Sequence, residues 1–247
     1  MLGTLCSLLA ALTCVSAVTV VTQQPSVVTL TRGETASIDC NLGSVSNYPA
    51  FWHKQIPGGL PQYMLYFHQS YTDVKYGSGF SSPHFTSTSQ SVSDYRLIIN
   101  NVEEGDSAVY YCNTWDSSAK ENVSQWVFGG GTKLIVTGSS LPPPVLTFYR
   151  PSTNPLSSSH AALVCLARQM SIGFAEVSWL VNGSPVTEGT WTSTAVQHPD
   201  KTFQLSSHLS LRACDFSEER SYTCKVTVGS SSFEKTMRMS ECRNTLE

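Results

Sequence analysis

Hydrophobic and polar residues alternate with a period of two along much of the chain, which is typical of half-buried β-strands. The segment TASIDC places Ala36, Ile38 and Cys40 on one face, and the segments HLSLRACDF and SYTCKVTV alternate in the same way. The segment ALVCLA is hydrophobic without interruption, as in a strand buried on both sides. Turn sequences such as PGG and NG separate these runs, and EEGDSA has room for a single helical turn. The pattern predicts an all-β protein.

The strands fall into two halves that share one arrangement of cysteine, tryptophan and tyrosine. These residues are Cys40, Trp52, Tyr110 and Cys112 in the first half, and Cys165, Trp179, Tyr222 and Cys224 in the second. The arrangement is typical of the immunoglobulin sandwich, in which a disulfide joins two sheets and the indole packs against it. Each tyrosine lies two positions before a cysteine, so both side chains point inward. We expect its hydroxyl to hydrogen-bond back to the chain at the preceding corner.

The interval between the two cysteines is longer in the first half, which leaves room for two more strands. This predicts a variable-type sandwich followed by a constant-type sandwich. The segment before the second half is rich in Gly, Ser and Pro and reads as a linker. The expected organisation is a signal peptide at 1–17, a variable-type domain at 18–137, a linker at 138–144 and a constant-type domain with its tail at 145–247.

The signal peptide is predicted from a hydrophobic start that ends in small residues, although the positive charge that such peptides prefer is missing. The run is shorter than the roughly 20 residues of a membrane span, and no later segment is hydrophobic for long enough. We therefore expect a secreted mature chain without membrane insertion, or one held at the cell surface by a membrane-bound partner. Such an oxidising location favours disulfides among the six cysteines that remain.

Composition and charge narrow the function further. The chain is 40% hydrophobic and 13% charged with a net charge of −3, and its Lys and Arg residues form no block. These values argue against nucleic acid as a partner. The GSG at 77–79 lacks the context of a catalytic serine, and no phosphate-binding loop is present. We therefore expect no enzyme activity and no cofactor. No Cys-x-x-Cys pair occurs and no His lies at ligand spacing from a Cys, so we also expect no metal site.

Several short motifs, taken in order, resemble those of an antibody light chain. They are DSAVYYC and FGGGTKL in the first half, then ALVCLA, VSWLVNG and SYTC in the second, with SEC near the end. Phe128 stands where heavy chains usually have tryptophan, so the likeness is to a light chain or a T-cell-receptor chain. The long segment 67–83 resembles that of sigma- or lambda-like light chains from non-mammalian vertebrates.

This resemblance implies that the chain pairs with an immunoglobulin heavy chain to bind an antigen. It places three hypervariable loops within 41–51, 67–76 and 113–127, at one end of the sandwich. The residues expected to contact antigen are Tyr48, Tyr71, Trp115, Asp116 and Trp126. Two alternatives remain open: Trp126 packs against the partner domain instead, or Trp115 is an exposed loop residue without an antigen role.

The heavy chain is expected to contact the outer face of one sheet of the variable-type domain. By strand parity and the family pattern, that face carries Gln55, Pro61, Tyr111 and Phe128. His53 stands where the family usually has tyrosine. His84 stands where light chains commonly have an arginine that pairs with Asp106, so we expect a weaker, pH-dependent pair or none.

The two remaining cysteines and two sequons suggest covalent additions. In the family, a cysteine placed like Cys242 forms a disulfide to the heavy chain. The alternative is a bond between Cys214 and Cys242 within this chain. The sequons at Asn122 and Asn182 predict glycosylation.

Two rival identities remain, a T-cell-receptor-type chain and a surrogate or accessory immunoglobulin-like protein. A receptor chain is expected to continue into a connecting peptide and a membrane span, whereas this sequence ends five residues after Cys242. We therefore expect the secreted light chain.

Overall fold

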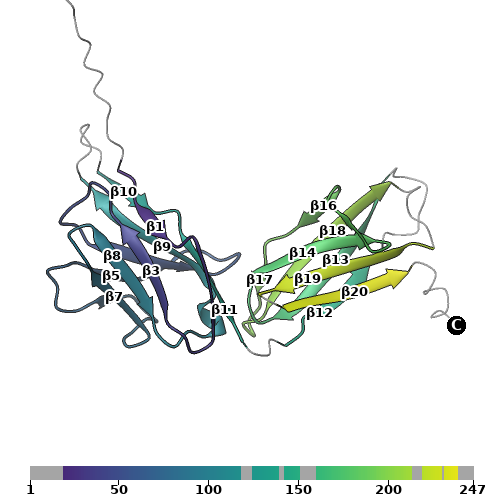
Figure 1. The fold of residues 1–247 in the computed structure, drawn as a ribbon, viewed down its shortest axis with the longest axis horizontal. Helices are drawn as coiled ribbons and strands as arrows, with labels where there is room; N and C mark the ends of the chain where they lie inside the picture. The colour runs from purple at the N-terminus through teal and green to yellow at the C-terminus, as the bar shows by residue number, and fades with distance from the viewer. Residues whose placement is uncertain are drawn as a thin grey trace, which may run out of the picture.

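The protein folds as two β-sandwiches in tandem (Figure 1). The computed structural model describes residues 19–117, 124–138, 142–150, 160–212, 219–229 and 231–238. In this part of the chain the one helical element is a 3-10 turn, η1 (Glu104–Asp106), in the EEGDSA segment. No helix in the described ranges is long and apolar enough to cross a membrane. The all-β prediction is confirmed.

One sheet of the first sandwich has four strands, in the order β1-β3-β8-β7. Their bounds are β1 Thr22–Gln24, β3 Ala36–Asn41, β8 Asp94–Ile99 and β7 Phe85–Ser89. The other sheet follows the order β2-β11-β9-β4-β5-β6, with β10 beside β9. Its strands are β2 Val27–Thr31, β11 Thr132–Thr137, β9 Ala108–Asp116, β4 Ala50–Gln55, β5 Gln62–Phe67, β6 Lys75–Tyr76 and β10 Gln125–Phe128. β5 and β6 are the two additional strands that the longer cysteine interval predicts.

The core of the first sandwich has the predicted composition. Cys40 on β3 and Cys112 on β9 form the disulfide that joins the two sheets. Trp52 and Tyr110 are fully buried, and the Tyr110 hydroxyl donates a 2.7 Å hydrogen bond to the backbone oxygen of Asp106. The tyrosine therefore fastens β9 to the turn before it.

The second sandwich also has two sheets, β12-β13-β18-β16 with β17 beside β18, and β15-β14-β19-β20. The first comprises β12 Val145–Tyr149, β13 His160–Met170, β18 Phe203–Arg212, β16 Thr190–Thr192 and β17 Val196–Gln197. The second comprises β15 Ser184–Val186, β14 Ala175–Val181, β19 Ser221–Val228 and β20 Ser231–Arg238. Cys165 bonds to Cys224 between them. Trp179 is buried beside this disulfide, and its Nε1 donates to Ser207 Oγ at 2.9 Å.

The two sandwiches touch at the turn that joins β4 to β5. Gly58 has φ +71°, and a Cβ there would collide with the carbonyl oxygen of Ala195 in the second domain. Lys133 Nζ lies 4.4 Å from the centre of the Phe174 ring, and Ile135 packs against the second core. β11 ends at Thr137 and β12 begins at Val145, although 139–141 lie outside the described residues. The domain limits remain predictions.

Several expectations concern residues outside the described part of the chain. These are the signal peptide at 1–17, the sequon at Asn122 and the two cysteines Cys214 and Cys242. They also remain predictions.

Candidate functional site

The third expected loop is a β-hairpin over much of its length. β9 continues to Asp116 and β10 begins at Gln125, so these two residues are paired. Trp115 lies opposite Trp126 in this ladder, and their rings meet edge-to-face at 5.2 Å. The loop expected within 113–127 is therefore paired as strand at both of its ends. The cross-strand aromatic pair stabilises the ladder at this end.

The other two expected loops connect strands as predicted. β3 ends at Asn41 and β4 begins at Ala50, while β5 ends at Phe67 and β6 begins at Lys75. In the first loop, the Tyr48 hydroxyl lies 2.8 Å from Ser117 Oγ, which follows β9. The first loop is thus tied to the base of the third.

Aromatic rings form a continuous line along the loop end of the larger sheet. Phe51 stacks on Tyr66 at 5.1 Å and meets Trp126 edge-to-face at 5.0 Å. Tyr66 contacts Tyr71 at 6.0 Å, and Trp115 extends the line beyond Trp126. Trp126 is 48% exposed and Tyr71 is 40% exposed. The line is therefore a partly exposed aromatic surface.

Trp126 lies where both of its expected roles are possible. It belongs to the loop hairpin, yet it contacts Phe51 on the outer face of the sheet. Asp116 differs, because it is only 4% exposed. A carboxylate so buried is poorly placed for direct contact with antigen, which argues against the role expected for it.

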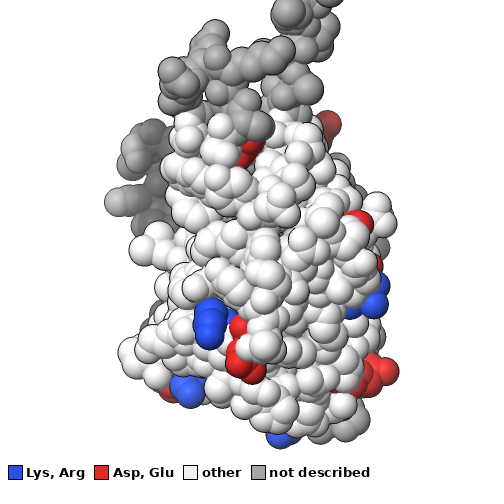
Figure 2. Space-filling view, turned by 90° about the vertical axis from the view of Figure 1, so that its left-hand side faces the viewer, with Lys and Arg blue, Asp and Glu red and all other residues white. Residues whose placement is uncertain are grey.

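The four residues expected at the partner face come together around one shallow pocket. The pocket has a volume of about 260 Å³ and is lined by His53, Gln55, Pro61, Tyr111, Phe128 and Gly129. Phe128 is 53% exposed, and none of the lining residues carries a carboxylate or an ammonium group. The side of the first sandwich seen in Figure 2 is likewise mostly uncharged. We call the pocket residues, with Tyr63, the variable face.

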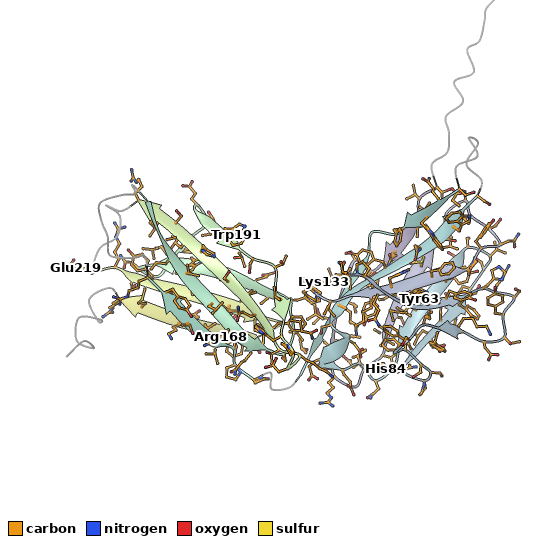
Figure 3. All side chains as sticks on the ribbon, turned by 180° about the vertical axis from the view of Figure 1, so that it is seen from behind. Tyr63, His84, Lys133, Arg168, Trp191 and Glu219 are labelled. Carbon is orange, nitrogen blue, oxygen red and sulfur yellow. A yellow bond between two sulfur atoms is a disulfide. The ribbon has the colours of Figure 1, made fainter. Side chains whose placement is uncertain are left out.

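Two exposed residues beside the pocket were missed by the sequence reasoning. Tyr63 (Figure 3) pairs with His53 across β4 and β5, and their rings lie 5.7 Å apart. Leu60 is 88% exposed next to Pro61. The register of β4 and β5 shifts at Trp52/His53, so simple alternation in QYMLYF does not assign Tyr63 to this face. The position of Leu60 directly after the PGG turn was the sequence feature that could have indicated its exposure.

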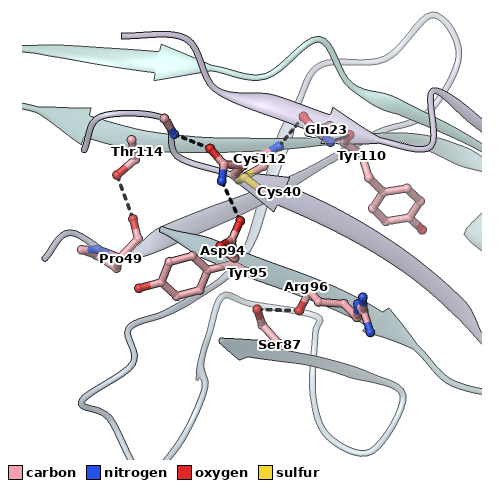
Figure 4. The surroundings of a disulfide bond; sticks show 12 residues. Gln23, Cys40, Pro49, Ser87, Asp94, Tyr95, Arg96, Tyr110, Cys112 and Thr114 are labelled. Atoms are coloured by element: carbon pink, nitrogen blue, oxygen red, sulfur yellow. Dashed lines mark hydrogen bonds between the residues drawn. A yellow bond between two sulfur atoms is a disulfide. The ribbon is translucent and has the colours of Figure 1, made fainter. Parts of the chain in front are cut away.

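Gln23 ties β9, the strand that pairs with β10, to the backbone that follows Phe128. Its Nε2 donates to the Tyr110 oxygen at 3.0 Å, and its Oε1 accepts from the Cys112 and Gly131 amides at 2.9 and 3.2 Å (Figure 4). A Cβ on Gly129 would collide with this side chain. Any larger residue at 129 would therefore have to displace the Gln23 side chain from its hydrogen bonds.

His53 occupies the centre of the variable face. Its ring lies 6.0 Å from that of Phe128, and its Nδ1 has no hydrogen-bond partner among the described residues. Burial lowers the pKa of His53, while contact with the Asn113 side chain opposes that shift. The imidazole is thus held toward its neutral form.

A second cluster lies at the opposite end of the domain from the loops and joins His84 to Asp106. His84 Nε2 lies 2.9 Å from Asp106 Oδ2, so the pair expected to be weak or absent is formed. Lys54 Nζ, missed from the sequence, lies 3.5 Å from Asp106 Oδ1 and donates to the Gly105 oxygen at 2.7 Å. Burial lowers the pKa of Lys54, and the charge of Asp106 opposes this. The cluster fastens η1 to β4.

The second sandwich carries an exposed aromatic face that the sequence reasoning did not predict. One row crosses four strands, since Tyr149 pairs with Val164, Val164 with His208, and His208 with Trp191. Trp191 is 61% exposed and Tyr149 is 51% exposed. The Trp191 and His208 rings lie 5.2 Å apart, and Trp191 belongs to the outer strand β16 (Figure 3). We call this row the constant face.

Two further predictions for the described residues concern metal ligands and a glycosylation site. No three His, Cys, Asp or Glu side chains gather as metal ligands in the described ranges. Asn182 is exposed in the turn between β14 and β15, where its Oδ1 accepts a 2.9 Å hydrogen bond from the Ser221 amide. Its glycosylation remains a prediction.

Comparisons with known proteins agree with this architecture. Residues 23–137 match the family model of the immunoglobulin V-set domain, and residues 146–231 match that of the immunoglobulin C1-set domain. A curated relative is a viral T-cell receptor beta chain-like protein of feline leukemia virus, which is 30% identical over 174 residues. The alignment covers 69% of this chain and 53% of the relative, so the chain spans about half the length of that protein. This chain therefore carries an immunoglobulin V-set domain followed by an immunoglobulin C1-set domain.

Proposed function

We propose that the protein is one chain of a heterodimeric antigen receptor. In this proposal the V-set domain packs through the variable face against the V-type domain of a second chain. The observation that carries it is the uncharged aromatic pocket around Phe128, a residue that is 53% exposed although β10 is paired with β9, which Gln23 bonds at Cys112. An exposed aromatic surface on a rigid support is typical of a protein interface.

The position of the variable face relative to the loops supports an antigen-binding role. The ring line from Phe51 to Trp126 continues from this face to the loop end of the sheet. A partner domain seated on Phe128 brings its own loops beside those of this chain. The two sets of loops then form one combining surface on a rigid scaffold. Tyr48, Tyr71 and Trp115 are the residues of this chain that we propose for antigen contact.

The constant face supports pairing along the whole chain. Trp191 and Tyr149 are exposed tryptophan and tyrosine side chains, a class that often contributes strongly to binding. We propose that this face meets the constant-type domain of the same partner. Two separate contacts in one pair strengthen association because the second forms within an existing complex.

Two kinds of receptor fit this arrangement. The order of the light-chain motifs favours an antibody light chain, with Cys242 bonded to the heavy chain. The relative named as T-cell receptor beta chain-like favours a T-cell-receptor-type chain, and among the comparisons it gives that second candidate the stronger support. We propose export for either kind, with glycans at Asn122 and Asn182.

Co-expression tests the proposal and separates the two candidates. The chain is produced with a heavy chain, and separately with T-cell-receptor-type partner chains, all from the same animal. We expect a heterodimer with one kind of partner on size exclusion, and on non-reducing gels a covalent species that Cys242→Ser removes. Phe128→Arg is expected to abolish assembly. Ser37→Arg on the opposite sheet is the matched control, since Ser37 is exposed on β3, and it should leave assembly unchanged. A chain that remains alone with every partner contradicts the proposal.

A further inference from the structure

Both proposed pairing faces have a histidine at their centre. On the variable face, His53 lies between Tyr63 and Phe128, with ring distances of 5.7 and 6.0 Å. On the constant face, His208 lies between Val164 and Trp191 in the cross-strand row. The two histidines belong to different domains and to unrelated strands. The position of a histidine at the centre of each face is therefore a separate observation in each domain.

The surroundings of His53 provide no charge to balance a protonated ring. From β5 the titratable group beside it is Tyr63, and from β9 it is Tyr111, its register partner. From β10 the neighbour is Phe128. Lys54 follows His53 in the chain, but its ammonium group lies on Asp106 and Gly105 at the far end of the domain. A partner domain closing on this face would bury the imidazole further.

The surroundings of His208 are similar. Val164 faces it from β13 and Trp191 from β16, and its Nε2 lies 3.4 Å from Ser206 Oγ. By strand alternation, the charged residues with described side chains on this face of β13 and β18 are the cations Arg168 and Arg212. His198 reaches the end of the same sheet through Gln204 but is exposed. No carboxylate is among these neighbours.

We propose that the pairing of this chain is released by mild acid, because the partner closes over His53 and His208 only in their neutral form. This inference rests on the proposed function. A protonated imidazole covered by aromatic groups loses hydration and gains no counter-charge, so protonation favours the separated chains. Affinity is then fully present above the pKa that the imidazole has in the separated chain. It falls as the pH drops through that value, since the separated state binds the protons.

The direction of the His53 shift agrees with this mechanism. Burial already lowers the pKa of His53 in the unpaired chain, and further burial by a partner acts in the same direction. For His53 the loss of affinity therefore begins below its already lowered pKa. An additional lowering of the His53 pKa by one unit corresponds to about a tenfold change in affinity once the pH lies below both pKa values.

The test measures the dissociation constant at pH 7.4 and pH 5.5 against the partner chain identified by co-expression. All chains carry Cys242→Ser, so that no disulfide to the partner masks release. We expect the parent chain to bind several-fold more weakly at pH 5.5 than at pH 7.4, because a histidine whose pKa in the separated chain is lowered, as that of His53 is, can weaken binding by less than about tenfold at this pH. His53→Tyr and His208→Tyr should each remove about half of this effect on a logarithmic scale, and together nearly all of it. His198→Gln is the matched control and should behave like the parent.

Each other outcome decides against the inference or against the proposed function. A parent chain whose affinity changes less than twofold between the two pH values overturns the inference, while pairing itself stands. A double variant that keeps the full pH dependence also overturns it. Unfolding of the isolated chain at pH 5.5, followed by circular dichroism, assigns the acid effect to the fold and overturns it as well. Absence of binding at pH 7.4 contradicts the proposed function instead.

Discussion

The two domains share one core design but expose aromatic residues on opposite sheets. In the V-set domain the exposed face lies on the sheet that holds Trp52 and Cys112. In the C1-set domain it lies on the sheet that holds Cys165, while Trp179 belongs to the other sheet. The same disulfide, tryptophan and tyrosine therefore do not decide which side of a sandwich meets a partner.

The outward residues of each sheet decide this instead. On β19 and β20, the sheet that corresponds to the variable face, polar pairs cover the surface. Thr223 Oγ1 lies 2.8 Å from Thr236 Oγ1, and Lys225 Nζ lies 3.3 Å from Glu234 Oε1. Such a surface is well hydrated and offers little apolar area for association. The core fixes the fold, and the alternate residues of the same strands select the interface.

The largest expected effect comes from removing the core tryptophans, which tests how alike the two cores are. Trp52→Ala and Trp179→Ala should each destabilise their own domain by about 3–5 kcal/mol. Replacement by phenylalanine should separate them, because Trp179 Nε1 donates to Ser207, whereas Trp52 Nε1 has no acceptor among the described residues. Trp179→Phe is therefore expected to cost about 1 kcal/mol more than Trp52→Phe.

Differential scanning calorimetry, with one transition followed for each domain, measures both effects. Equal costs for the two phenylalanine variants would mean that the Trp179–Ser207 bond contributes nothing, and the two cores would be equivalent.

The second prediction concerns the buried ion cluster of the V-set domain. Asp106→Ala should lower the free energy of unfolding of that domain by about 3 kcal/mol, because Lys54 stays buried without its counter-charge. Asp39→Ala is the control, since the Arg96–Asp39 pair is 2.6 Å long but exposed. It should cost less than about 1 kcal/mol. Similar losses in the two variants would contradict the special role of the cluster.

The pH dependence of Asp106→Ala has a definite sign. The pKa of Lys54 is lowered by burial, and loss of Asp106 lowers it further. The unfolded chain then binds the proton more tightly, so stability rises with pH up to the ordinary lysine pKa of about 10.4. Urea unfolding at pH 7 and pH 9.5 should show a smaller defect at the higher pH.

The third prediction compares the two faces directly. Phe128→Ala and Trp191→Ala should each weaken pairing by about 2 kcal/mol, or roughly 30-fold. Neither should lower the unfolding temperature of the isolated chain by much, since both side chains are more than half exposed. Calorimetric titration against the partner measures the affinity. A loss in Phe128→Ala alone would restrict pairing to the V-set domain.

The smallest expected effect concerns one exposed carboxylate in each domain. Hydrogen bonds from Ser91 and then Asn41 lower the pKa of Asp94, and those from Thr202 lower the pKa of Asp200. Ser91→Ala and Thr202→Ala should each raise the pKa of the corresponding aspartate. The stability that each bond adds is present above the ordinary aspartate pKa and is lost as the pH falls through the lowered value.

NMR titration of the carboxyl carbons measures both shifts. We expect partial rises in both, because Asp94 keeps its hydrogen bond from Asn41 and Asp200 keeps that from the Thr202 amide. An unchanged Asp94 in Ser91→Ala would assign its low pKa to Asn41 alone.

The sequence was sufficient for features that depend on local spacing. Period-two alternation and the intervals between Cys40, Trp52 and Cys112 predicted the sheets, the disulfide and the buried tyrosine. Parity around Cys112 also placed Tyr111 on the variable face. These inferences need only the geometry of a single strand.

Features that depend on register between distant strands could not be read in this way. Trp191, His208 and Tyr149 form one row only because three separate strand pairings align them. Lys54 reaches Asp106 across 52 residues of sequence. The paired ends of the third loop depend on Trp115 meeting Trp126, and neither residue alone signals a strand.

The paired base of the third loop has a consequence for diversification. Because the ladder from Asp116 and Gln125 down to Phe128 is closed by its own hydrogen bonds and ring contacts, the segment above it can change in length or composition without moving Phe128. Under the proposed function, recognition would vary between molecules of this kind while the surface that meets the partner stays the same. A foreign peptide grafted between Ser117 and Ser124 should for the same reason leave assembly unaffected.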